Sequence, residues 1–160
     1  MELAILKEIN KKYIEAVNYY EKVIDKDTPA SPYNYINLAF LYWSFAFEFI
    51  EFDIPNNITE DWSVIGGNRY QKILELGLSN YPNNTEMLFW EKYFKHIIYG
   101  EDFSEKNCTQ LLKKYGESKV PYFFLYLFNT EKYMENRNQL LSQCEELPTA
   151  KNNYIKSIIE

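Results

Sequence analysis

The sequence predicts an all-α protein of about eight antiparallel helices stacked as α-hairpins. Apolar residues recur at intervals of three and four along most of the chain, the spacing that places them on one face of a helix. Short breaks rich in Pro, Gly, Asn and Ser separate these stretches, and such residues end or cap helices. Because 160 residues bury enough surface to fold without a disulfide or a metal, residues 1–160 are expected to form a single α-helical domain.

The first two predicted helices differ in how much of their surface is apolar. Residues 2–26 carry one apolar stripe, with lysine and acidic side chains on the opposite face. Ser31 is expected to cap the next helix, with Pro32 in its first position, and that helix is expected to run to about Phe52. Because this second helix is apolar nearly all round, it must be covered on several sides.

Asn, Gly and Pro residues set the boundaries in the middle of the chain. Residues 53–62 are predicted to be a loop, because a proline and two asparagines interrupt the helical pattern. A third helix is expected after the Gly66-Gly67 pair, and it closes at the next Pro-Asn dipeptide. Asn84 then caps a fourth helix, which continues until Gly100.

The last third of the chain leaves two points open. The N-cap of the fifth helix is either Asp102, paired with Glu105 three residues later as in a capping box, or Ser104 alone. Residues 120–128 would suit a short helix or a buried strand, and helix is favoured because no second strand is available to pair with it. The remaining two helices are predicted at residues 131–146 and 149–159.

Parts of this pattern resemble a known helical repeat. Residues 13–27, followed by Pro29, resemble the second helix of a tetratricopeptide repeat and its closing proline. Residues 34–42 resemble the first helix of the next repeat, and residues 74–86 contain a similar helix-Pro-Asn-helix junction. The resemblance covers residues 13–43 and 70–94. Because Pro29 and Pro82 are 53 residues apart, against a usual period of about 34, it implies an irregular tetratricopeptide-like array.

The negative charge of the chain is concentrated in one segment. Between Ala30 and Asn68 there is no Lys or Arg, but there are five acidic residues, whereas the rest of the chain is nearly neutral. These residues are Glu48, Glu51, Asp53, Glu60 and Asp61. Together with the neighbouring Trp62, they are predicted to form a binding surface for a basic protein partner. The first three lie at the end of a predicted helix, where the helix dipole disfavours anions, so local stability does not explain them.

Residues that could support catalysis are few. His96 is the only histidine, and it lies on an apolar helix face without a carboxylate three or four residues away. Cys108 and Cys144 fall on apolar stripes and are predicted to be core thiols. The Gly66-Gly67 pair lacks the further glycines and the lysine of a phosphate-binding loop, so it is predicted to be a helix start or hinge. We therefore predict a protein that is not an enzyme and has no cofactor.

Charge and hydropathy also argue against two classes of partner. With a net charge of −6 and no basic cluster longer than two residues, the chain lacks the positive surface that nucleic-acid binding requires. The apolar stretch 35–50 contains Glu48 and is shorter than the roughly 20 residues of a membrane span. The first residues lack the basic start and apolar run of a signal peptide, so a cytoplasmic location is expected.

Two classes of function remain. The first is a protein-binding module, in its sharpest form an acidic bacterial immunity protein that neutralises a basic, nuclease-like toxin domain. Within this class, a tetratricopeptide-like adaptor or peptide-binding regulator fits nearly as well. The second is a helical enzyme in which Glu48, with Glu51 or Asp53, binds a divalent metal. It is less favoured because a helical metal site needs ligands from facing helices as well.

Overall fold

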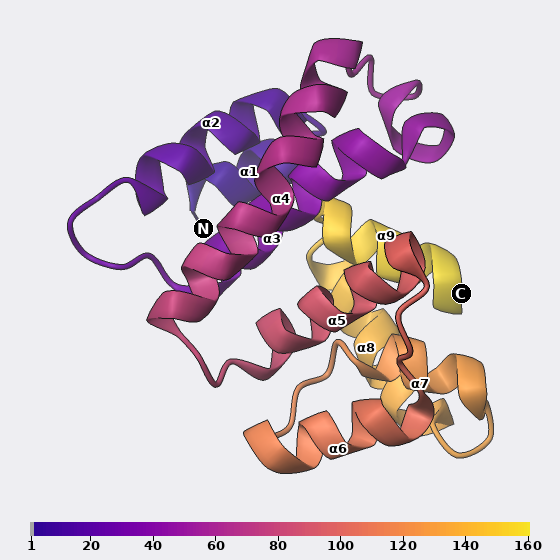
Figure 1. The fold of residues 1–160 in the computed structure, drawn as a ribbon. Helices are drawn as coiled ribbons and strands as arrows, with labels where there is room; N and C mark the ends of the chain where they lie inside the picture. The colour runs from indigo at the N-terminus through magenta and orange to yellow at the C-terminus, as the bar shows by residue number, and fades with distance from the viewer. Residues whose placement is uncertain (1) are drawn as a thin grey trace.

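The structure, a computed structural model, describes residues 2–160, and every regular element in this range is helical (Figure 1). Nine α-helices and one π-helical turn, η1, follow one another along the described chain. Their bounds are α1 Leu3–Ile9, α2 Tyr13–Ile24, α3 Pro32–Phe47, η1 Phe49–Asp53, α4 Glu60–Asn80, α5 Thr85–Tyr99, α6 Glu105–Tyr115, α7 Tyr122–Phe128, α8 Met134–Glu146 and α9 Ala150–Ile159. The all-α prediction is confirmed, although the expected number of eight helices was too low.

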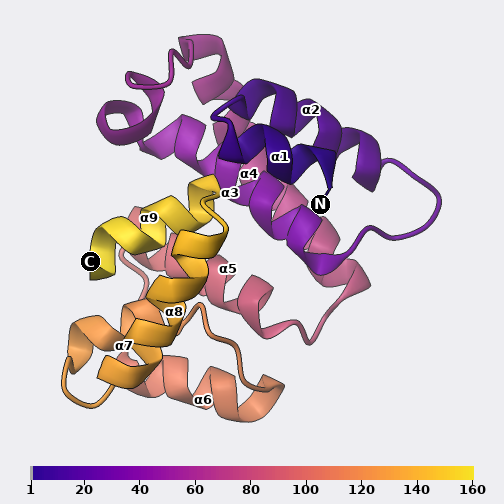
Figure 2. The same cartoon turned by 180° about the vertical axis from the view of Figure 1, so that it is seen from behind.

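Helix α3 is the centre of the molecule. Successive α-helices pack against each other along the chain, and α3 also contacts α5 and α9. Figures 1 and 2 show α1 to α4 gathered on one side and α5 to α8 on the other, with α9 beside α3. Every residue of α3 from Asn34 to Phe45 is buried. This confirms the prediction that the second apolar stretch is covered on several sides.

The single helix predicted over residues 2–26 is two helices. Lys11 has a φ of 58°, in the left-handed region that ends a helix and reverses the chain. The side-chain amide of Asn10 donates to the carbonyl of Leu6 at 2.8 Å and closes the end of α1. Because α1 and α2 then pack on each other, the two parts of one apolar stripe are buried in the same core.

The second predicted helix also ends earlier than expected. α3 stops at Phe47, and Glu48, with φ −107° and ψ 50°, leaves the helical conformation. In the following turn η1, the Asp53 N–H donates to the Glu48 carbonyl at 3.1 Å and the Ile54 N–H to that of Phe49 at 3.0 Å. Such π-helical turns are rare and occur often at functional sites.

The Gly66-Gly67 pair lies inside α4, which begins at Glu60, so the prediction of a helix start or hinge there was wrong. Gly66 faces α3: a Cβ atom at this position would lie 2.2 Å from the carbonyl oxygen of Tyr42. A Cβ on Gly67 would meet nothing nearer than the Ala46 Cβ, at 3.8 Å. The first glycine therefore allows the backbones of α3 and α4 to approach closely.

The predicted boundaries of α5 are confirmed. The Asn84 side chain accepts a hydrogen bond from the Met87 N–H at 3.0 Å, and Gly100 ends the helix with a φ of 68°. Of the two caps left open for α6, the structure has Ser104, which forms a reciprocal capping box with Asn107. The ambiguous stretch near residue 125 is helix α7, as favoured.

Aromatic side chains join the two sides of the molecule. Trp43 of α3 stacks on Phe94 of α5, with ring centroids 4.9 Å apart. Tyr154 of α9 packs edge-on against Trp43 at 5.3 Å, and its hydroxyl lies 2.6 Å from that of Tyr93. Each such aromatic pair contributes about 0.5–1.5 kcal/mol beyond its buried area, so these contacts hold α3, α5 and α9 together.

Glu8, which is only 1% exposed, links the beginning of the chain to its last helix. Its carboxylate accepts hydrogen bonds from the Tyr20 hydroxyl at 2.5 Å and from the Ala150 N–H at 2.9 Å. Ala150 is the first residue of α9, where backbone N–H groups have no partner within the helix. Burial raises the pKa of Glu8 to about 7, although both hydrogen bonds favour the ionised form.

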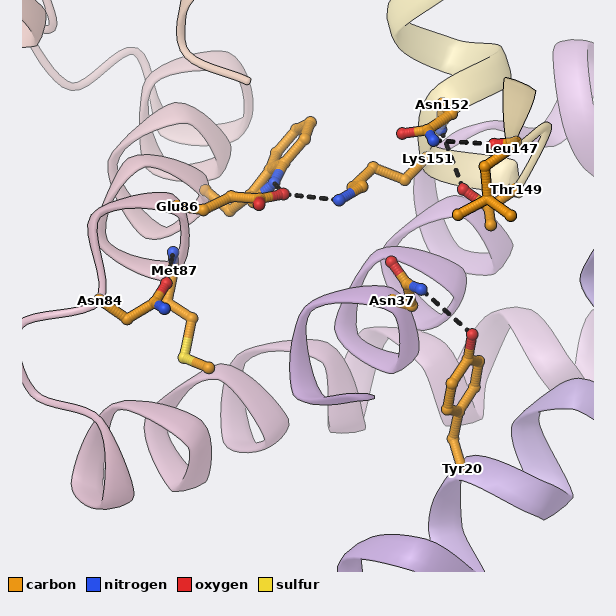
Figure 3. A network of polar contacts seen from close by, with 10 residues as sticks. Tyr20, Asn37, Asn84, Glu86, Met87, Leu147, Thr149, Lys151 and Asn152 are labelled. Atoms are coloured by element: carbon orange, nitrogen blue, oxygen red, sulfur yellow. Dashed lines mark hydrogen bonds and ion pairs between the residues drawn. The ribbon is translucent and has the colours of Figure 1, made fainter. Parts of the chain in front are cut away.

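Polar contacts around α9 extend this link (Figure 3). Lys151 donates to Glu86 of α5 at 2.6 Å, and the Thr149 side chain caps α9 by accepting from the Asn152 N–H at 3.3 Å. The Asn37 amide of α3 donates to the Tyr20 hydroxyl at 3.1 Å. The start of α9 is thereby tied to α1 through Glu8 and to α5 through Lys151.

The glycine pair gives the first testable prediction. Gly66→Ala should destabilise the protein by about 1–3 kcal/mol, because its Cβ has no room beside the α3 backbone. Gly67→Ala is the matched control: it adds the same atom to the same helix and should be neutral or stabilising by up to about 1 kcal/mol. Urea unfolding followed by circular dichroism measures both free energies. Equal stability of the two variants would show that α3 and α4 do not meet at Gly66.

A second prediction concerns pH. Because the pKa of Glu8 is about 7 in the folded protein against 4.5 ordinarily, the folded state binds the proton more tightly than the unfolded state. This contribution to the free energy of unfolding is complete below pH 4.5 and is lost as the pH rises through 7. Its full size is roughly 3 kcal/mol.

Glu8→Gln removes this titration. Glutamine has nearly the same shape as glutamate and no charge, so its side-chain oxygen can still accept from the Ala150 N–H while its amide faces the Tyr20 hydroxyl. Relative to wild type, the variant should therefore gain stability between pH 5 and pH 8. Urea unfolding at both pH values is the measurement, and a difference that does not change with pH would contradict the prediction.

Candidate protein-binding site

The residues predicted to bind a partner lie in one part of the structure. Glu48, Glu51 and Asp53 belong to the turn that follows α3, whereas Glu60, Asp61 and Trp62 belong to the first turn of α4. We call residues 47–65 the acidic corner. In both views it forms the end of the molecule furthest from α6 (Figures 1 and 2).

The acidic side chains of the corner differ in exposure. Glu51, Glu60 and Asp61 are exposed, and Glu48 is half-buried. Asp53 is only 2% exposed, so its carboxylate lies beneath the surface that a partner would contact. The spacing of apolar residues and the distribution of charge in the sequence could not predict the burial of Asp53, because this burial results from the π-helical turn.

Local structure explains some of these charges and not others. Glu60 and Asp61 occupy the first turn of α4, where the positive end of the helix dipole stabilises anions. The prediction of a loop over residues 53–62 was therefore wrong at its end, because Glu60 and Asp61 begin a helix that their charges stabilise. Glu48 is the C-cap of α3, where the dipole has the opposite sign, and Glu51 lies in the turn immediately after it. These two carboxylates have no stabilising role at the end of the helix.

The carboxyls around η1 also disfavour one another's charge. Burial raises the pKa of Glu48, and the nearby Glu51 adds to this effect. Burial and the charge of Glu48 raise the pKa of Asp53 to about 6. Within residues 2–160, the Asp53 Oδ1 has no hydrogen-bond partner. A bound cation would stabilise all three carboxylates in their ionised form.

Within residues 2–160, no basic side chain forms an ion pair with the acidic corner. The next basic residue along the chain, Arg69, is bound to Glu21 of α2 at 2.6 Å and lies over the ring of Tyr42. Its charge is therefore already compensated by Glu21. The acidic corner keeps its negative charge for an external partner.

Exposed apolar side chains lie among these charges. Phe49 and Ile50, in η1, are 62% and 72% exposed, and Ile54 and Val64 are also exposed. Trp62 is half-buried and packs edge-on against Phe45 at 5.9 Å. Apolar anchors surrounded by charge are typical of protein interfaces.

The histidine and the two cysteines, which carry the most reactive side chains of the chain, are packed against or hydrogen-bonded to other residues of the fold. His96 is half-buried; its Nδ1–H donates to the carbonyl of Glu101 at 2.7 Å, and its ring packs edge-on against Phe124. Cys108 and Cys144 are buried, as predicted, and burial raises their pKa values to about 12 and about 11. Among residues 2–160, no three His, Cys, Asp or Glu side chains are grouped so that they could share a metal ion.

Comparisons with protein-family models, with curated proteins and with solved structures gave no match to this chain. Within the described residues, no helix combines the length and the apolar character that crossing a bilayer requires.

The two cysteines provide a third prediction. At pH 8 the high thiol pKa values leave almost no thiolate, and burial prevents access of a reagent. Both thiols should therefore react with a disulfide reagent such as Ellman's reagent only as fast as the protein opens, and promptly in denaturing urea. Stoichiometric labelling of the native protein within the mixing time would show that one of these thiols is accessible.

Proposed function

We propose that this chain is a non-enzymatic protein-binding module that binds a basic protein partner through the acidic corner. The observation that carries this proposal is the juxtaposition of exposed apolar side chains, Phe49 and Ile50, with the exposed carboxylates of Glu51, Glu60 and Asp61. Apolar anchors supply affinity, and the surrounding charges supply association rate and selectivity.

In its sharpest form, the proposal is a cytoplasmic immunity protein that neutralises a basic toxin domain. A nuclease toxin carries positive charge because it must hold phosphate groups. An inhibitor of such a domain gains association rate from acidic groups, and it needs no catalytic residues of its own. A small helical protein with a net charge of −6 concentrated in one corner has these properties.

A second candidate is a tetratricopeptide-like adaptor or peptide-binding regulator. Two observations favour it: successive helices pack as hairpins, and a groove of about 830 Å³ lies between η1 and α9. An extended peptide could bind in such a groove, whereas an immunity protein can use any convex acidic face. The enzyme with a carboxylate-bound metal is less favoured, because Asp53 is buried and, among the described residues, no three His, Cys, Asp or Glu side chains are grouped so that they could hold a metal ion.

Charge reversal gives the fourth prediction. The triple variant Glu51→Lys, Glu60→Lys, Asp61→Lys should slow association with the basic partner at least about tenfold at low salt, because it removes electrostatic steering. The difference should shrink as the Debye length falls from ~10 Å at 0.1 M to ~3 Å at 1 M salt. If the neighbouring gene encodes a basic protein domain, that domain is the partner to test first, by stopped-flow measurement of the association rate.

A matched control is available near α6 and at the start of α8. Asp102, Glu131 and Glu135 are exposed and have no ion-pair partner in residues 2–160, so their reversal to Lys changes the net charge equally at a distance from the acidic corner. This control should slow association much less. If both variants slow it equally, only the net charge matters and the corner is not the interface.

A further inference from the structure

The groove between η1 and α9 combines acidic and aromatic walls. Its volume is about 830 Å³, and its walls include Tyr13 of α2, Phe52 of η1 and Tyr154 of α9. Glu48 and Glu51 line the same groove. None of the α9 residues lies near the acidic run in the sequence, so the sequence analysis did not identify this groove.

A second hollow, of about 450 Å³, adjoins the groove. It is lined by Trp43, Phe47, Ile97 and the same Glu48 and Tyr154 that border the groove. Trp43 is only 1% exposed, and its indole N–H has no acceptor in residues 2–160. The ring of Trp43 forms part of the wall of this hollow, between α3 and α9.

The charges of the two hollows are unbalanced. Within residues 2–160, neither Glu48 nor Glu51 has a hydrogen-bond or ion-pair partner for its side chain, and Glu48 is half-buried. Lys11 is the only cation that lines the groove, and it forms no ion pair in the described chain. The lining therefore carries a net negative charge, beside aromatic rings on both sides of Glu48.

We propose that these two hollows bind one arginine side chain of the protein partner, with Glu48 as its principal counter-ion and Glu51 as the second. A guanidinium group stacks on aromatic rings and donates to carboxylates in a planar fork, which an ammonium group cannot do. Because Glu48 borders both hollows, one residue of the partner can occupy both.

This inference rests on the proposed function, since the arginine belongs to the basic partner, but it is tested separately. The probe is N-acetyl-arginine amide, titrated to roughly 50 mM, a range that detects millimolar dissociation constants. N-acetyl-citrulline amide, which is uncharged and has nearly the same shape, is the control ligand. Two-dimensional NMR follows the indole N–H signals, and Trp43→Phe assigns the signal of Trp43.

The expected result is saturable binding of the arginine compound, followed as a shift of the Trp43 indole signal because this ring lines the hollow. Citrulline should bind at least about tenfold more weakly, and Glu48→Gln with Glu51→Gln should weaken arginine binding to a similar extent. Lys11→Gln should strengthen it, because a like charge is removed from the groove. The control Glu131→Gln with Glu135→Gln, outside both hollows and outside the acidic corner, should leave it unchanged.

Three results would overturn the inference: no saturable shift, equal binding of arginine and citrulline, or arginine binding that survives the loss of Glu48 and Glu51 in a folded protein. These outcomes leave the proposed function standing if reversal of the acidic corner still slows association with the basic partner. Arginine binding without any effect of corner reversal, which includes Glu51→Lys, would contradict both the acidic corner as the interface and the assignment of the arginine to the partner.

Discussion

The close approach of α3 and α4 at Gly66 is the constraint on which the position of the acidic corner depends. Gly66 meets α3 at Tyr42, five residues before α3 ends at Phe47, and six residues after α4 begins at Glu60. The chain between these two ends must therefore leave α3 and return to α4 within a short distance. It does so in the π-helical turn, whose wide hydrogen bonds direct Phe49 and Ile50 outward while Asp53 points inward.

Local signals in the sequence predicted the fold where the cause of an element is itself local. Asn84 and Gly100 bound α5 because a side-chain cap and a left-handed glycine act within one helical turn. The breaks that were missed have causes beyond their own segments. Lys11 adopts a left-handed conformation without being glycine, because the packing of α1 on α2 stabilises that reversal. Gly66 looked like a helix start because its neighbour in space, the Tyr42 carbonyl, is not its neighbour in sequence.

The same distinction applies to the candidate site. A count of charges along the chain identified the acidic run, since it requires no knowledge of folding. The count could not separate Glu60 and Asp61, which stabilise the start of α4, from Glu48 and Glu51, which have no such role. Nor could it bring Tyr154 beside Glu48, because that contact exists only when α9 packs on α3.

Two groups of acidic residues in this protein have raised pKa values, and they differ in a way that bears on function. Glu8 is buried but has two hydrogen-bond donors, from Tyr20 and Ala150, so its carboxyl is part of the internal architecture. Glu48 and Asp53 also have raised pKa values, yet residues 2–160 supply no cation or donor to Glu48 and leave the Asp53 Oδ1 unpaired. A raised pKa alone therefore does not indicate a binding site. The acidic corner differs because its carboxylates repel one another without a compensating cation in the fold and lie beside exposed apolar side chains. A basic partner would stabilise the carboxylates in their charged form and cover the apolar side chains.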